Sequence, residues 1–135
     1  MKVLTVGVFD LLHYGHFELF RRSKELAGPN GHLVVAVQED DVVVKYKPEA
    51  KLVYSFDIRC KMIAALRYVD EVVPYRDIDE SIKDIDFDIF AIGGDQTHAG
   101  FQRAVAWCEA NGKKVLRMTR TEGISSSQLR AGGMK

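Results

Sequence analysis

The sequence predicts an α/β fold, a Rossmann-like doubly wound parallel sheet of about five strands with helices on both faces. Two observations carry this prediction. Apolar runs without in–out alternation recur along the chain, as in parallel strands that are covered on both faces. Segments whose apolar residues lie three or four positions apart separate these runs, as in amphipathic helices. The chain of 135 residues has the length of one domain, so residues 1–135 are expected to form a single one.

The expected strands are five apolar runs. The first covers residues 2–8 and leads into a short loop at 9–12, and the others cover residues 33–37, 71–75, 89–92 and 115–118. Open parallel sheets bind ligands beyond the carboxyl ends of their strands. The residues that follow the strands are therefore the first candidates for a functional site.

Three segments between these strands have helical spacing. The apolar residues that define their inner faces are Phe17, Phe20 and Ala27 in the first, Ile58, Met62, Ile63 and Leu66 in the second, and Phe101, Ala104, Val105 and Cys108 in the third. Gly28-Pro29-Asn30-Gly31 ends the first helix and turns into the second strand. Residues 41–54 lack clear periodicity and are expected to form a loop.

The motif His13-Tyr14-Gly15-His16 follows the first strand at the point where a helix is expected to begin. A helix start offers unpaired N–H groups and a positive dipole end, which attract phosphate. Gly15 allows a ligand close to the backbone, and two imidazoles can donate hydrogen bonds to phosphoryl oxygens. Taken alone, two neighbouring histidines are also compatible with a plain helix cap.

A second motif, Arg120-Thr121-Glu122-Gly123-Ile124-Ser125-Ser126-Ser127, follows the last expected strand. Ser125 or Ser126 suits the N-cap of a C-terminal helix. Hydroxyls and backbone amides at a helix start, with an arginine upstream, indicate a second anion site. A plain capping motif is the alternative interpretation. The sheet topology brings both motifs to the same edge.

Composition narrows the classes of function. Lys plus Arg and Asp plus Glu number 19 each, so the formal net charge is zero. This balance argues against a nucleic-acid or membrane surface, both of which favour basic excess. No apolar stretch reaches the length of a membrane span and no signal peptide is recognised. Cys60 and Cys108 lack metal-ligand spacing and are expected to be reduced thiols in a cytoplasmic protein.

Three stretches, residues 7–16, 67–74 and 120–125, together resemble the HxGH nucleotidyltransferase superfamily, and most of all its small cytidylyltransferase family. The resemblance extends from about residue 2 to about residue 130 and implies one nucleotidyltransferase domain. It implies transfer of CMP from CTP to a small phosphomonoester, glycerol 3-phosphate by default. Pyrophosphate and a CDP-linked product would be released. It also implies a homodimer and Mg²⁺ held mainly by phosphate oxygens and water, without metal ligands from the protein.

The resemblance also implies roles for particular residues. The expected catalytic residues are His13, His16, Lys47 and Arg120. The further expected nucleotide contacts are Val8, Phe9, Gly94, Asp95, Thr121, Gly123, Ile124, Ser125, Ser126 and Ser127. The expected acceptor contacts are Lys45, Arg59, Arg67 and Lys83; Arg59 is included because it shares a helix face with Arg67, eight residues later. A lysine in a loop supplies a positive charge without demanding rigid geometry.

Departures from the family pattern leave alternatives open. Gly93-Gly94-Asp95-Gln96 replaces the Gly-Asp-Asp-Trp typical of glycerol-phosphate enzymes and looks more like the adenylyltransferase domain that activates heptose phosphate. Ser81 stands near the position of a family lysine, with Lys83 two residues later. The alternatives are an adenylyltransferase for a sugar phosphate or pantetheine phosphate, and a nucleotide-binding sensor without catalysis. Ethanolamine phosphate also remains open as the acceptor.

Overall fold

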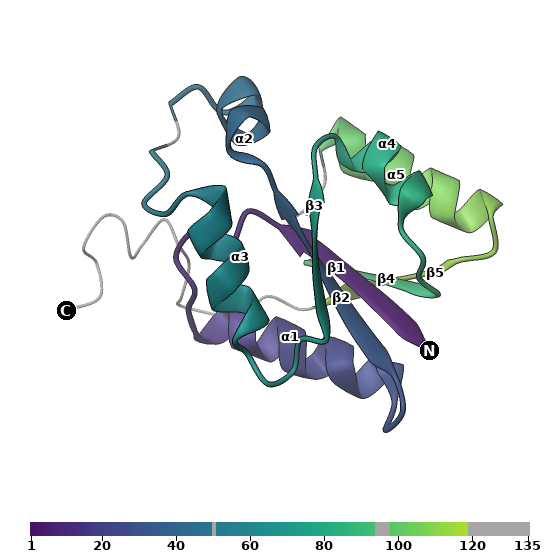
Figure 1. Cartoon of the computed structure of the whole chain (residues 1–135). Helices are drawn as coiled ribbons and strands as arrows, with labels where there is room; N and C mark the ends of the chain where they lie inside the picture. The colour runs from purple at the N-terminus through teal and green to yellow at the C-terminus, as the bar shows by residue number, and fades with distance from the viewer. Residues whose placement is uncertain (50, 94–97, 119–135) are drawn as a thin grey trace.

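The structure, a computed structural model, describes residues 1–49, 51–93 and 98–118. Five parallel strands form one sheet in the order β3-β2-β1-β4-β5 (Figure 1). Their bounds are Lys2–Gly7 for β1, His32–Gln38 for β2, Glu71–Tyr75 for β3, Ile89–Gly93 for β4 and Lys114–Met118 for β5. Strands β2 and β3 lie on one side of β1, and β4 and β5 lie on the other. The predicted doubly wound parallel sheet is therefore confirmed.

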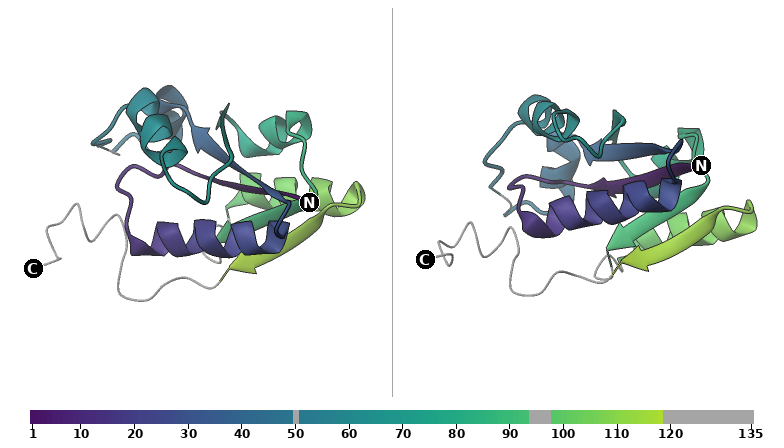
Figure 2. Two further views of the ribbon diagram at one scale, coloured as in Figure 1. Left: turned by 60° about the horizontal axis from the view of Figure 1, so that its bottom comes forward. Right: turned by 90° about the horizontal axis from the view of Figure 1, so that it is seen from below.

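Helices cover both faces of this sheet (Figure 2). Helices α1 (Tyr14–Ala27) and α3 (Phe56–Ala64) pack on one face. The other face carries α4 (Ile78–Ser81), a short 3₁₀ turn η1 (Ile82–Asp84) and α5 (Ala99–Ala110). None of the helices in the described ranges is long and apolar enough to cross a membrane.

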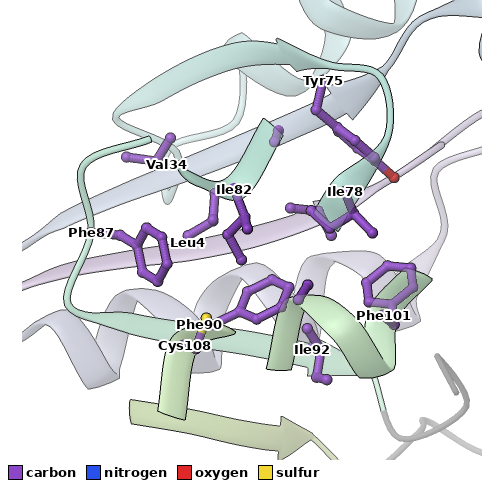
Figure 3. Close-up of a cluster of buried hydrophobic side chains, with 13 residues drawn as sticks. Leu4, Val34, Tyr75, Ile78, Ile82, Phe87, Phe90, Ile92, Phe101 and Cys108 are labelled. Carbon is purple, nitrogen blue, oxygen red and sulfur yellow. The ribbon is translucent and has the colours of Figure 1, made fainter. Parts of the chain in front are cut away.

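Alternate residues of the strands pack into two hydrophobic cores, one on each face of the sheet. In β1, Val3 points toward α1, while Leu4 and Val6 join the core under α4 and α5 (Figure 3). Because both faces are covered, inner strands such as β1 are buried along nearly their whole length. This arrangement explains the continuous apolar runs that predicted the strands.

Two helical predictions need correction. Residues 41–54 were expected to form a loop, but α2 occupies Asp40–Tyr46 and buries Val42 and Val43. Two turns are too short to show helical periodicity in the sequence. In α3 the buried residues are Arg59 and Ile63, whereas Ile58 is 45% exposed. The charged residue Arg59 is thus buried at a position on the helix where the apolar pattern predicted Ile58.

The register of the sheet brings the carboxyl ends of its strands together. Gly7 pairs with Val37, Gln38 with Tyr75, and Gly93 with Met118. The segments that leave these strands therefore begin at the same edge. These are the start of α1 after β1, α2 after β2, α4 after β3 and α5 after β4.

Candidate active site

The two histidines of the first motif form a reciprocal cap at the start of α1. His13 is the N-cap residue, and its Nδ1 accepts a hydrogen bond of 3.0 Å from the Gly15 N–H. The His16 Nδ1 reaches back and accepts from the His13 N–H at 3.3 Å. Their rings stack with centroids 3.9 Å apart. The capping interpretation is therefore correct, and it leaves both Nε2 atoms outside the cap.

His16 is held as a neutral hydrogen-bond donor. Burial lowers its pKa to about 3, and the neighbouring His13 adds to this effect. Since Nδ1 accepts a backbone N–H, the single ring proton of the neutral imidazole must lie on Nε2. His16 also lines the cavity described below. It can thus offer an N–H group to a ligand without carrying a net charge.

Phe9 fixes the orientation of His16 from the other side. Its ring meets the His16 ring edge-on, with centroids 5.3 Å apart, and meets Phe20 in the same way at 5.2 Å. The backbone of Phe9 has a φ of 54°, a left-handed conformation that is unusual for a bulky residue. A Cβ at Gly7 would lie 2.8 Å from the Phe9 ring. Gly7 is therefore required for this fold of the β1–α1 connection.

A cavity of about 780 Å³ opens at the carboxyl edge of the sheet. Its lining comes from the ends of β1, β2, β3 and β4, the first turns of α1, the last turn of α2, and the starts of α4 and α5. The volume lies in the range of small-molecule sites. The lining residues are Val6, Gly7, Val8, Phe9, Asp10, His16, Leu19, Gln38, Val43, Tyr46, Lys47, Tyr75, Asp77, Ile78, Asp79, Gly93, His98, Ala99, Gly100, Phe101 and Arg103.

Four of the predicted site residues meet in this cavity, namely Val8, Phe9, His16 and Lys47. His13 supports it through the cap and the stacked ring. The remaining predictions for the nucleotide and for catalysis lie outside the described residues. These are Gly94, Asp95, Arg120, Thr121, Gly123, Ile124, Ser125, Ser126 and Ser127.

The prediction that Arg59 contacts the acceptor is not supported by its position. Its side chain is fully buried, and its guanidinium donates to three partners on separate segments. These partners are the Val8 carbonyl at 2.7 Å, the Tyr54 carbonyl at 3.2 Å and the Asp40 carboxylate at 2.5 Å. Asp40 also accepts from the Phe56 N–H at 3.0 Å. Arg59 therefore joins β1, α2 and α3 instead of facing a ligand.

Asp10 reinforces the same junction. Its two carboxylate oxygens accept from the Val53 and Tyr54 N–H groups, each at 2.8 Å. The sequence did not single out this residue, although it follows the first strand directly, where site residues were expected. Asp10 and Arg59 together attach the connection between α2 and α3 to the end of β1.

The other predicted acceptor contacts lie away from the cavity lining. Arg67 is exposed in the turn that leads into β3, at the amino edge of the sheet and beyond the end of α3. This position does not support its acceptor role, because the cavity lies at the opposite edge. Lys83 lies in η1, 3.7 Å from Glu80, and Lys45 sits 5.3 Å from the Tyr46 ring centroid. Neither lysine lines the cavity, so their roles stay predictions.

The far wall of the cavity, formed by the last turn of α2, the end of β3 and the starts of α4 and α5, contains functional candidates that sequence reasoning missed. Tyr46 donates a hydrogen bond to Asp77, and Arg103 donates to Asp79 at 2.7 Å. Burial lowers the pKa of His98, and the positive charges of Lys47 and Arg103 lower it further. Asp77 and Asp79 follow β3 as His13 follows β1. Applying the carboxyl-edge rule to the third strand would have found both carboxylates.

Comparison with known proteins places this geometry in a family. The model of the cytidylyltransferase-like family matches residues 4–132. The chain belongs to this family. Glycerol-3-phosphate cytidylyltransferase of Bacillus subtilis (strain 168) is 35% identical over 96% of this chain and 94% of the relative. FAD synthase of Thermococcus kodakarensis is 40% identical over 96% of this chain and 78% of the relative.

A solved structure has the same fold. The lipopolysaccharide core biosynthesis protein from Thermoplasma volcanium GSS1 superposes with a TM-score of 0.74 at 25% identity. The match covers 90% of this chain and 98% of that one. The chain is therefore an enzyme of the nucleotidyltransferase class with a cytidylyltransferase-like domain.

In this cytidylyltransferase-like enzyme, the segment after β3 holds α2 at both ends. Arg76 donates to Glu39 at 3.1 Å and to both oxygens of Asp41 at 3.1 and 2.8 Å, which anchors the first turn of α2. This contact lowers the pKa of the Asp41 carboxyl. The last turn is anchored by the bond between Tyr46 and Asp77. Lys47 follows directly, so these contacts fix where its side chain starts.

Replacing Arg76 by alanine is expected to raise the nucleotide KM roughly 3–10-fold, because α2 and Lys47 lose a positioning contact. Exposed ion pairs contribute little to stability, so the melting temperature should hardly change. Steady-state kinetics and thermal unfolding of Arg76→Ala and Arg76→Lys would measure both quantities. Arg76→Lys keeps the positive charge but loses the two-pronged guanidinium contact, so its nucleotide KM should lie between those of the wild type and Arg76→Ala. A lowered melting temperature with an unchanged KM would contradict the positioning role.

Proposed function

We propose that this enzyme transfers CMP from CTP to a small phosphomonoester, with glycerol 3-phosphate as the default acceptor. In this reaction an oxygen of the acceptor phosphate attacks the α-phosphorus of CTP in line. A new P–O bond forms, the bond between the α-phosphorus and the bridging oxygen breaks, and pyrophosphate leaves with that electron pair. The acceptor phosphate is already ionised near neutral pH, so the protein does not need to supply a strong base.

The observation that carries the proposal is the neutral, capped His16 in a cavity that also contains Lys47. The His16 Nε2–H group suits an oxygen that gains negative charge as the α-phosphorus becomes five-coordinate. Its orientation is fixed in advance by the cap and by Phe9, so little reorganisation is required. The Lys47 ammonium would balance charge on the triphosphate.

The chemistry also calls for Mg²⁺, which would supply charge neutralisation on the triphosphate. The described residues contain no cluster of three or more His, Cys, Asp or Glu side chains that could hold a metal. The two carboxylates at the junction that holds the end of β1 are already bonded, Asp10 to two N–H groups and Asp40 to Arg59 and Phe56. These residues fit an ion that arrives with the nucleotide and keeps phosphate and water as its ligands.

The choice of nucleotide is tested by pyrophosphate release with CTP, ATP, GTP and UTP in the presence of glycerol 3-phosphate and Mg²⁺. CTP is expected to give the highest kcat/KM, in keeping with the relatives named glycerol-3-phosphate cytidylyltransferase. A variant with His16 replaced by glutamine serves as the inactive control for contaminating enzymes that release pyrophosphate from the nucleotides. Faster release with ATP would overturn the cytidylyl assignment while leaving nucleotidyl transfer in place.

Adenylyl transfer is the second candidate, because relatives named FAD synthase are 38% and 40% identical to this chain. Its acceptor would be another phosphomonoester, such as a sugar phosphate. The same nucleotide panel, repeated with several phosphomonoesters, separates the two candidates. Binding of nucleotide without any pyrophosphate release would instead indicate a sensor.

A further inference from the structure

Tyr75 places a phenol hydroxyl at the cavity from an almost fully buried ring. It is the last residue of β3, is 5% exposed and belongs to the core under α4 and α5. In Figure 3 the ring extends from β3 toward Ile78 and Phe101, with the hydroxyl oxygen at its tip. All three residues line the cavity.

Within the part of the chain that the structure describes, no hydrogen-bond partner is found for the Tyr75 hydroxyl. Its polar neighbours on the same wall differ in this respect. Tyr46 is bonded to Asp77, Arg103 to Asp79, and the Gln38 amide donates to the Arg76 carbonyl at 3.0 Å. The ring of Tyr75 is buried while its hydroxyl opens into the cavity. The hydroxyl is therefore available for a hydrogen bond with a ligand bound there.

The surroundings of Tyr75 restrict the chemistry of that ligand group. Burial raises the pKa of the Tyr75 phenol well above its usual value, so the hydroxyl keeps its proton and can both donate and accept. Ile78 and Phe101 are apolar, and the two carboxylates of this wall are already bonded, Asp77 to Tyr46 and Asp79 to Arg103. Further negative charge would meet Asp77 and Asp79. An uncharged hydroxyl group fits this environment best.

We propose that the Tyr75 hydroxyl binds a hydroxyl group on the carbon chain of the acceptor and thereby selects polyol phosphomonoesters. This inference rests on the proposed function, because it assigns the far wall of the same cavity to the acceptor. The acceptor phosphate would then lie toward His16, and the hydroxylated carbons toward β3. Tyr75 is thus a specificity residue that the sequence motifs do not contain.

The test compares the wild type with Tyr75→Phe, using glycerol 3-phosphate, ribose 5-phosphate, ethanolamine phosphate and propyl phosphate as acceptors. Propyl phosphate retains the phosphate but offers no hydroxyl. In the variant, the KM of a hydroxylated acceptor should rise about tenfold, as expected for one lost hydrogen bond. The KM of CTP and the kinetics with propyl phosphate should not change. Tyr68→Phe is the matched control, since Tyr68 packs against the core on the opposite face.

Thermal unfolding of the ligand-free variant separates this role from a structural one. Because the hydroxyl has no described partner, Tyr75→Phe should melt at the wild-type temperature or above it. A clear drop in melting temperature, or an unchanged preference for hydroxylated acceptors, would overturn the inference alone. If the wild type preferred ethanolamine phosphate, the site would select a cationic acceptor instead of a polyol, and this result would also overturn the inference. A wild type that transfers nucleotide to none of the phosphomonoesters would overturn the proposed function itself.

Discussion

Replacing His16 by glutamine is expected to lower kcat by roughly 10²–10³-fold, because it removes a preorganised donor to the phosphoryl oxygens. Glutamine suits this position of a capping box, where its side-chain carbonyl can still accept from the His13 N–H. The folded state should therefore remain close to the wild type. Steady-state turnover and urea unfolding of the same preparation would measure both effects.

Alanine at position 16 provides the matched comparison. It removes the donor and the cap together, so it should lose a similar amount of turnover and also about 1 kcal/mol of stability. If His16 were only a cap, glutamine would restore the activity that alanine loses. Equal loss of turnover in both variants, with loss of stability in alanine alone, would assign the two roles separately.

The sequence predicted the part of the site that depends on local structure. The spacing of His13 and His16 is a local property, because a residue at the N-cap and one three positions later meet on the first turn of a helix. The strand ends could be predicted for a similar reason. Each inner strand is buried on both faces, which leaves a continuous apolar run.

The far wall of the cavity could not be derived in this way. Tyr75 looks like an ordinary strand residue, and the absence of a partner for its hydroxyl among the described residues depends on which groups of α4 and α5 surround it. The bond between Arg103 and Asp79 joins residues of two helices that are separated by β4. Such pairings form only because the chain returns to the same edge of the sheet. The periodicity of the sequence does not predict them.

Arg59 is the opposite case, because the sequence pattern suggested a ligand contact and the structure shows its side chain bonded inside the protein. Most arginines on helices are merely solvated, and an arginine near a predicted site can also bind phosphate. Two of its three partners lie far away in the sequence, since Val8 and Asp40 are 51 and 19 residues distant. Both partners belong to segments that leave the carboxyl edge of the sheet.

Replacing Arg59 by alanine is expected to lower the free energy of unfolding by about 3 kcal/mol, because three charge-assisted hydrogen bonds are lost from a buried site. Asp40 is partly exposed and can regain water, which keeps the loss below that of a fully buried partner. Arg59→Lys keeps the charge but cannot reach three acceptors at once, so it should lose less. Urea unfolding of both variants would measure these changes, with exposed Arg67→Ala as a control that stays within about 0.5 kcal/mol of the wild type.

Kinetics of Arg59→Lys then distinguish the internal role from direct contact with the acceptor. The Val8 carbonyl, the start of α2 and the entry to α3 all depend on this guanidinium. Loosening that junction should disturb Lys47 and the end of β1 together, so the KM values of nucleotide and acceptor should rise in parallel. A rise confined to the acceptor, in a variant as stable as the wild type, would show that Arg59 turns toward the ligand during turnover. The buried network instead requires that any loss of activity be accompanied by a loss of stability.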